Sequence, residues 1–196
     1  MHEFTLILGP MASGKSRTLI TELERYEIAN KKVVAIQPEV NVRDSGVASR
    51  NGLSREAVSL GKLSMYDEAF ELDNVDVIGV DEAFMFSDVG DTRRTVAYWL
   101  SQKKIVVAAA LDITAMGQMP ETIVGLLELA PDVKYERAVC TTCDEMDARY
   151  TLIYETESGK PIRSGLPPVV VDDGTYGYRP VCRCCFFGWD DESRNT

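Results

Sequence analysis

Residues 9–16 carry the clearest chemical signal in the chain, and we call them the phosphate loop. They fit the pattern G-x-x-x-x-G-K-[ST] and are, in order, Gly9, Pro10, Met11, Ala12, Ser13, Gly14, Lys15 and Ser16. Glycines allow a tight loop whose backbone N–H groups point at phosphate oxygens, while the lysine reaches the β- and γ-phosphates and the serine hydroxyl ligates Mg²⁺. The alternative is a chance glycine-rich turn. The position between an apolar run and a helical pattern favours the nucleotide interpretation.

Two adjacent carboxylates, Asp81 and Glu82, follow a second apolar run. In P-loop enzymes an aspartate at such a strand end holds Mg²⁺. The neighbouring glutamate points the other way and is placed to accept a proton from a substrate hydroxyl or a water. The alternative is that both carboxylates only solvate the strand end. Together with the phosphate loop, the pair predicts a Mg²⁺ site at Ser16 and Asp81 and a general base at Glu82.

All five cysteines lie near the C-terminal end of the sequence. Cys140 and Cys143 form one C-x-x-C pair, and Cys182 and Cys185 form another. Two such pairs suit a tetrahedral structural Zn²⁺ site without an open position. A redox C-x-x-C pair is the competing interpretation. Cys184 is not needed for this set of four ligands. It either takes the place of a neighbouring cysteine as a ligand or only packs against the protein.

The hydrophobic pattern predicts the elements that position these groups. Apolar runs indicate strands at 4–8, 32–36 (ended by Pro38), 75–80 and 105–111, and helical periodicity indicates helices at 16–28, 92–103 and 121–129. Residues 39–62 are interpreted as a functional loop. Buried strands that alternate with helices indicate a parallel α/β sheet. The composition changes near Arg137, which predicts two domains, 1–136 and 137–196.

Charge and composition exclude several classes of protein. The 196 residues carry a net charge of −10, which argues against a nucleic-acid partner held by phosphate contacts. Apolar runs are too short for a membrane span, and the first residues do not resemble a signal peptide. The chain is therefore expected to be soluble and cytoplasmic (of the cell, or of a phage host), with no membrane partner.

Several short segments, taken in order, resemble the zinc-containing thymidine kinase family of the cytosolic and phage type. Besides the phosphate loop, Asp81-Glu82 and the cysteine pairs, the matching segments are 41–43, 49–53, 109–112, 138–140, 150–151 and 178–183. Each minor segment is unspecific alone, but their order is specific. The resemblance implies a P-loop (RecA-like) parallel sheet flanked by helices, followed by a small C-terminal zinc-binding β/lasso domain.

The resemblance also implies an activity, which is transfer of the ATP γ-phosphoryl group to the 5′-hydroxyl of thymidine. Glu82 would be the general base, Lys15 a second catalytic residue, and family members are commonly homotetramers. The implied ATP site adds to the phosphate loop Asn41, Arg43, Asp81, Glu82, Ala83 and Phe84. The implied nucleoside site comprises Met11, Ala115, Thr151, Tyr178 and a lasso with Val169, Val170, Val171, Asp172 and Asp173, which zinc at Cys140, Cys143, Cys182 and Cys185 anchors.

Departures from the family concern the nucleoside half. Ala115 replaces a family aromatic, and Asp172-Asp173 replace part of the usual Ile-Gly-Gly. A related 5-substituted deoxyuridine is therefore a possible acceptor beside thymidine. Two alternatives stay open at this point. One is another nucleoside or nucleotide kinase with a zinc-tied lid, and the other is a nucleotide-binding regulatory protein without turnover.

Overall fold

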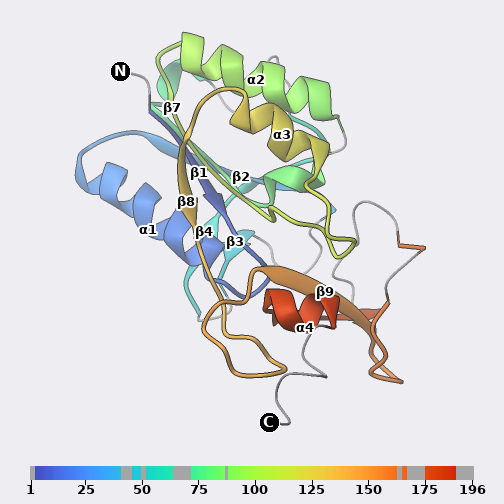
Figure 1. Cartoon of the computed structure of the whole chain (residues 1–196). Helices are drawn as coiled ribbons and strands as arrows, with labels where there is room; N and C mark the ends of the chain where they lie inside the picture. The colour runs from blue at the N-terminus through green and yellow to red at the C-terminus, as the bar shows by residue number, and fades with distance from the viewer. Residues whose placement is uncertain are drawn as a thin grey trace.

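A six-stranded sheet forms the centre of the molecule in a computed structural model, which describes residues 3–40, 46–49, 52–63, 72–86, 88–162, 165–166 and 175–188. The strand order is β5-β2-β6-β7-β1-β8 (Figure 1). All five neighbouring pairs are parallel. The strands are β1 (Phe4–Leu8), β2 (Val33–Pro38), β5 (Val58–Leu60), β6 (Val77–Val80), β7 (Ile105–Ala110) and β8 (Asp132–Tyr135). The predicted parallel α/β fold is confirmed.

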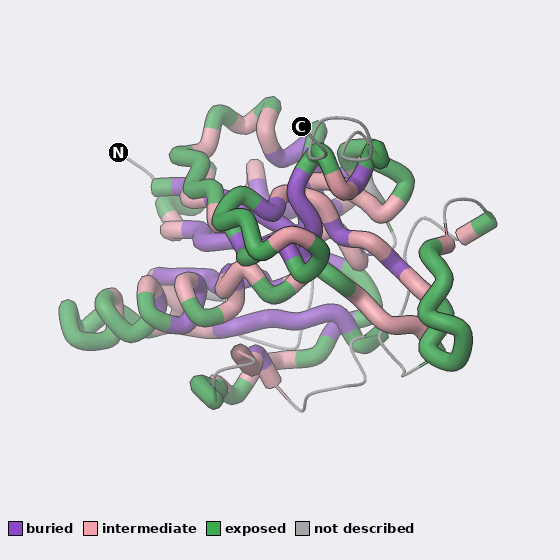
Figure 2. The backbone as a smooth tube through the Cα atoms, turned by 60° about the horizontal axis from the view of Figure 1, so that its bottom comes forward, coloured by how far each residue is buried: buried purple, intermediate pink, exposed green. Residues whose placement is uncertain are grey.

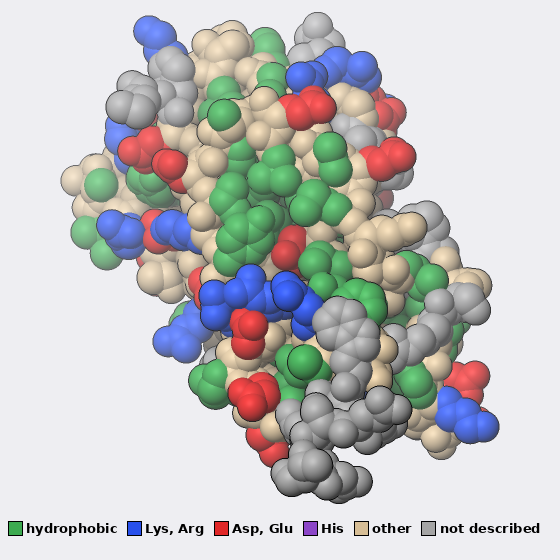
Figure 3. Space-filling model, in the orientation of Figure 1, with side chains coloured by type: hydrophobic (Ala, Val, Ile, Leu, Met, Phe, Trp, Pro, Cys, Tyr) green, Lys and Arg blue, Asp and Glu red, His purple; other side chains and the backbone are tan. Residues whose placement is uncertain are grey.

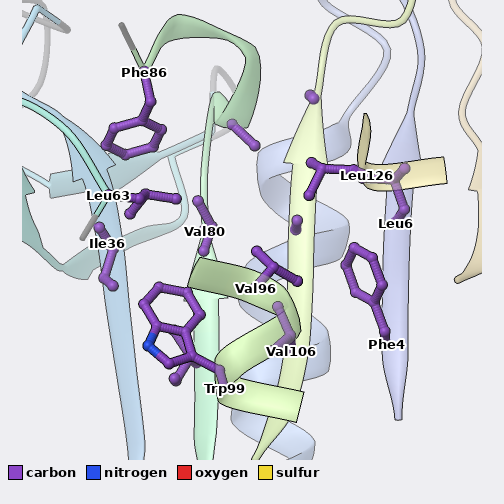
Figure 4. Close-up of a cluster of buried hydrophobic side chains, with 14 of the residues drawn as sticks. Phe4, Leu6, Ile36, Leu63, Val80, Phe86, Val96, Trp99, Val106 and Leu126 are labelled. Atoms are coloured by element: carbon purple, nitrogen blue, oxygen red, sulfur yellow. The ribbon is translucent and has the colours of Figure 1, made fainter. Parts of the chain in front are cut away.

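Helices cover both faces of this sheet. Helix α1 (Lys15–Ile28) buries Leu19, Ile20 and Leu23 against one face. Helices α2 (Val89–Ser101) and α3 (Glu121–Leu127) pack on the other face, with the indole of Trp99 1% exposed (Figure 4). Figure 2 shows the resulting layers, with buried backbone running between exposed helical surfaces. Because the strands are parallel, their carboxyl ends lie at one edge of the sheet, where the phosphate loop follows β1 and Asp81 follows β6.

A second, smaller layer follows the sheet in the chain. Strands β9 (Tyr150–Glu155) and β10 (Tyr176–Val181) form an antiparallel pair, and helix α4 (Arg183–Phe187) follows directly (Figure 1). The ring of Tyr150 stacks on Phe186 with a centroid distance of 4.4 Å. We call residues 138–162 and 175–188 the zinc module. The structure confirms a distinct cysteine-bearing unit, while the domain limits 1–136 and 137–196 stay a prediction.

Three parts of the sequence prediction were wrong or incomplete. The segment 39–62, expected to be a loop, contains β5 and the hairpin β3 (Gly46–Ala48) and β4 (Ser54–Glu56). Strand β8 and helix α4 were not predicted, because β8 is exposed at every position and α4 is only five residues long. Pro38 is the last residue of β2 instead of lying beyond it. The short 3₁₀ turns η1 (Leu72–Asn74) and η2 (Ala83–Met85) complete the described elements.

Helix length and polarity also bear on the membrane question. In the part of the chain that the structure describes, each helix is too short or too polar to cross a bilayer.

Candidate active site

The phosphate loop connects β1 to α1 and has an unusual backbone. Gly9 and Gly14 have φ values of 155° and 95°, and Ala12 adopts a left-handed conformation with φ 60°. The ammonium of Lys15 folds back and donates a hydrogen bond of 2.8 Å to the carbonyl of Pro10. Gly14 precedes α1 without a side-chain cap. The first amides of α1 are thus available to an anion, as the motif predicts.

Gly9 is required by its close approach to the end of β8. A Cβ atom at Gly9 would lie 2.5 Å from the carbonyl oxygen of Glu136. The carboxylate of Glu136 also accepts a hydrogen bond of 2.6 Å from the hydroxyl of Thr18 on α1. Glu136 therefore lies against the first residue of the phosphate loop and is bonded to α1 just beyond the loop's last residue. Sequence reasoning missed this residue because it follows a strand that was itself not predicted.

The acidic pair lies beside the phosphate loop, as the sequence predicts. The hydroxyl of Ser16 donates a hydrogen bond of 3.3 Å to Oδ1 of Asp81. The same oxygen accepts from the backbone N–H of Glu82 at 3.0 Å. Burial and the neighbouring charge of Glu82 raise the pKa of Asp81 to about 7, although Ser16 and Lys15 act in the opposite direction. A hydroxyl and a carboxylate in contact are ligands that suit Mg²⁺.

Glu82 is held in a conformation that non-glycine residues seldom adopt. Its φ and ψ are 45° and 44°, in the left-handed region. Its Oε2 atom is buried and has no hydrogen-bond partner among the described residues. Strained backbone of this kind persists where the surrounding structure fixes it, and it is concentrated at functional sites. An acceptor oxygen without a partner beside a phosphate-type loop is suited to take a proton from a bound hydroxyl.

The cysteines of the two C-x-x-C pairs come together. The sulfur atoms of Cys140, Cys143, Cys182 and Cys185 all lie within 4.8 Å of one another. The Sγ atoms of Cys143 and Cys182 are 3.6 Å apart. Tetrahedral Zn²⁺ with Zn–S bonds of about 2.3 Å requires sulfur separations of about 3.8 Å, so the four residues fit this ion. Cys184 is exposed and does not belong to the cluster.

The environment of Cys140 favours the thiolate that a metal requires. Burial opposes ionisation, but backbone N–H groups of Cys182, Thr142 and Cys143 outweigh it, and the pKa of the Cys140 thiol falls to about 6. Backbone donors around a thiolate are also what a metal-binding knuckle supplies. The donor set thus matches structural zinc in residue type and spacing, and the lowered pKa of Cys140 favours its thiolate.

The residues expected around a nucleoside are only partly described. Thr151 is 2% exposed, and its Oγ1 accepts a hydrogen bond of 2.9 Å from the backbone N–H of Met11. Ala115 is half-buried after β7, and Tyr178 is half-buried on β10. Ala83 and Phe84 follow Glu82 in η2. The expected residues Asn41, Arg43, Val169, Val170, Val171, Asp172 and Asp173 lie outside the described residues.

A pocket of about 230 Å³ opens between the strand ends and the zinc module. Its lining includes Pro10, Asp112, Tyr135, Arg149 and Arg183 and, in the described part of the chain, neither Glu82 nor Thr151. Figure 3 shows a band of basic side chains below hydrophobic ones on the face seen in Figure 1.

Burial raises the pKa of Asp112, whose Oδ1 has no hydrogen-bond partner among the described residues.

Comparison with known proteins agrees with this geometry. The family model described as thymidine kinase matches residues 2–186. The chain is 32% identical over 183 residues to "Thymidine kinase" of Rabbit fibroma virus (strain Kasza), which covers 93% of this chain and 94% of that protein. It is 31% identical to "Thymidine kinase" of Sheeppox virus (strain KS-1), with coverage of 93% and 95%. With its phosphate loop, acidic pair and cysteine cluster in the expected places, the chain belongs to the thymidine kinase family.

Proposed function

We propose that the chain transfers the γ-phosphoryl group of ATP to the 5′-hydroxyl of thymidine, or of a related 5-substituted deoxyuridine. The observation that carries this proposal is the contact between Ser16 and Asp81. It joins the phosphate loop to the end of β6, where Glu82 presents a carboxylate oxygen without a partner in the described part of the chain. Membership of the family supports the identity of donor and acceptor.

The phosphate loop is assigned to ATP. Its backbone amides and the N-terminus of α1 would hold phosphate oxygens, and Lys15 would leave the carbonyl of Pro10 for the β- and γ-phosphates. Ser16 and Asp81 would hold Mg²⁺, which neutralises charge on the phosphates when bound. Asn41, Arg43, Ala83 and Phe84 are assigned to the ATP site by resemblance alone.

Glu82 is assigned as the general base. Its carboxylate would take the proton of the 5′-hydroxyl while that oxygen bonds to the γ-phosphorus and the bond to the β-phosphate oxygen breaks, releasing ADP. The acceptor would be held by Met11, Ala115, Thr151 and Tyr178 and by the lasso residues 169–173, all assigned by resemblance. Positioning and charge neutralisation, more than covalent chemistry, supply the rate.

The four clustered cysteines are assigned to a structural Zn²⁺. Four thiolates saturate a tetrahedral ion, so the site has no open position for a substrate. Its contribution is to fix the zinc module against the carboxyl end of the sheet. Assembly into a homotetramer and a cytoplasmic location are proposed from the family resemblance.

The test is a turnover assay with Glu82→Gln. Wild-type protein is expected to phosphorylate thymidine with ATP and Mg²⁺, and Glu82→Gln to lose about 10²–10⁴-fold in kcat while its affinity for ADP stays unchanged. Glu24→Gln, on the exposed side of α1, is the matched control and should keep full activity. Turnover that survives in Glu82→Gln would remove Glu82 from the base role.

The acceptor is tested in the same assay. Thymidine, 5-hydroxymethyl-deoxyuridine and deoxycytidine are compared at equal concentration, because Ala115 replaces an aromatic residue of the family. Activity on one of the two uracil-type nucleosides supports the proposal. ADP binding without phosphorylation of any deoxynucleoside would favour a regulatory protein, and phosphorylation of a nucleoside monophosphate would favour a different kinase.

A further inference from the structure

We propose that Thr151 is a positioning residue for the phosphate loop and that, through Thr151, zinc bound at the four cysteines controls how well the loop binds a nucleotide. The inference rests on the proposed function only in assigning nucleotide phosphates to the loop. It gives Thr151 a task other than contact with the nucleoside base.

The phosphate loop needs support from outside. Ala12 adopts a left-handed conformation although it carries a Cβ atom, which costs on the order of 1–3 kcal/mol. Within the loop, the Ser13 amide reaches the Pro10 carbonyl only at 3.4 Å. Lys15 also donates to that carbonyl, but its ammonium must turn to the phosphates when a nucleotide binds. The bond from Met11 to Thr151, which reaches across 140 residues, holds the chain immediately before Ala12.

Thr151 is in turn held by both cysteine pairs. It lies opposite Pro180 on β10, and Tyr150 lies opposite Val181, which directly precedes Cys182. From the first pair, the amide of Thr141 donates to the carbonyl of Pro180 at 3.0 Å. The residues that face Thr151 across the hairpin are therefore bonded to one C-x-x-C pair and continuous with the other.

The stacked rings reinforce the same connection. Tyr150, next to Thr151, packs on Phe186 in α4, the helix that carries Cys184 and Cys185. The backbone N–H of Arg149 bonds to the carbonyl of Val181 at 3.1 Å. An ion that joins the four sulfurs thus fixes the position of β9 and with it the hydroxyl of Thr151.

Removal of zinc should loosen this support. Two strands alone are marginally stable in water, so β9 would no longer present Thr151 at a fixed place. The Met11 amide would then lose its acceptor, and the loop would spend less time in the conformation that binds phosphate. Apparent affinity falls in proportion to that fraction.

Substitutions at Thr151 test the first half of the inference. Thr151→Val keeps the branched shape but removes the acceptor, and Thr151→Ser keeps the acceptor. Amide hydrogen exchange of residues 9–14 and calorimetric ADP affinity without nucleoside are measured on zinc-loaded protein. For Thr151→Val we expect about tenfold faster exchange and about fivefold to tenfold weaker ADP binding, because the partly buried N–H of Met11 loses its acceptor. Thr151→Ser should behave as wild type.

Thr156→Val is the matched control. This variant removes the hydroxyl of another threonine in the zinc module, and the hydrogen bond of that hydroxyl to the carbonyl of Thr175 is exposed. Both the exchange rate of residues 9–14 and the affinity for ADP should stay unchanged. Thr151→Ala serves as a second variant in case Thr151→Val folds poorly. Exchange in both variants at the wild-type rate would overturn the positioning role.

Zinc removal tests the second half. In wild-type protein, chelation of zinc should speed exchange in residues 9–14 and weaken ADP binding. In Thr151→Val it should add little, because both changes act on the same hydrogen bond. Unchanged exchange in zinc-free wild type, or equal effects in both proteins, would overturn the coupling. If wild-type protein fails to bind ADP, the proposed function fails, while the exchange measurements still decide this inference.

Discussion

The hydroxyl of Ser16 lies 3.3 Å from Oδ1 of Asp81, so the start of α1 and the end of β6 share one polar contact. The two residues are far apart in sequence, but each follows a strand of the same parallel sheet, β1 before Ser16 and β6 before Asp81, and the carboxyl ends of these strands lie at one edge. The same aspartate oxygen accepts from the backbone of Glu82. One carboxylate therefore joins the assigned metal site and the assigned base.

Ser16→Ala should lower turnover through the metal. Loss of one oxygen ligand next to Asp81 is expected to reduce kcat by about 10- to 100-fold, which corresponds to the free energy of a hydrogen bond or ligand contact to a charged group. The Mg²⁺ concentration that gives the half-maximal rate should also rise. Ser16→Thr retains the hydroxyl and should respond normally to Mg²⁺. Titration of the rate with Mg²⁺ separates the two variants, and an unchanged titration in Ser16→Ala would contradict the assignment.

Gly9→Ala should damage the phosphate loop by a steric clash. Its Cβ would lie 2.5 Å from the Glu136 carbonyl, and relief of such overpacking costs about 1–3 kcal/mol. We expect a lower melting temperature and at least about tenfold weaker ADP binding. Gly52, with φ 89°, has open space where a methyl group would lie, so Gly52→Ala controls for backbone strain of about 1–2 kcal/mol. ADP binding equal in the two variants would exclude the clash as the cause.

Cys143→Ser should abolish stoichiometric zinc. The remaining three thiolates cannot complete the tetrahedral site, and structural zinc contributes directly to folding. The melting temperature should fall by more than about 5 °C. Cys184→Ser, at an exposed sulfur outside the cluster, should retain zinc and stability. Metal analysis with thermal unfolding measures both, and zinc loss in Cys184→Ser instead would exchange the roles of the two cysteines.

Asp112→Asn should stabilise the protein at neutral pH. Burial raises the pKa of Asp112 above its ordinary value of 3.8, so the native state binds more protons than the unfolded state just above pH 3.8. The contribution of Asp112 to the free energy of unfolding therefore falls as the pH rises from about 3.8 through the raised native pKa, and it stays low at higher pH. The asparagine side chain of Asp112→Asn carries no charge at any pH. The gain in stability of this variant over the wild type should therefore disappear below about pH 3.8, where the carboxyl group is also neutral. Thermal unfolding at about pH 7 and at about pH 3.5 tests this, with Asp132→Asn on exposed β8 as the neutral control.

The sequence predicts the central sheet well and its margins poorly. Strands β1, β6 and β7 are apolar runs buried on both faces, and the phosphate loop has a fixed pattern, so both were predictable. Strand β8 is exposed throughout, and β4 reads Ser-Arg-Glu, so neither shows a hydrophobic period. These strands are set by partners distant in sequence, which a local pattern does not contain.

The site divides in the same way. The spacing of residues 9–16, of Asp81 with Glu82 and of the cysteine pairs is sufficient to predict which groups assemble. The contact of Met11 with Thr151 and the close approach of Glu136 to Gly9 depend on how the zinc module and the end of β8 lie against the loop. Both are single contacts between segments that are far apart in sequence. Neither contact can be predicted from the types or spacing of the residues that make it.

The cysteine cluster is completed late in the sequence. All strands of the six-stranded sheet end by Tyr135, whereas the second pair of metal ligands begins at Cys182. Because a chain is synthesised from its N-terminus, every strand of the sheet is made before the second pair of cysteines is added. The four-sulfur cluster is thus the last part of the site that the growing chain completes.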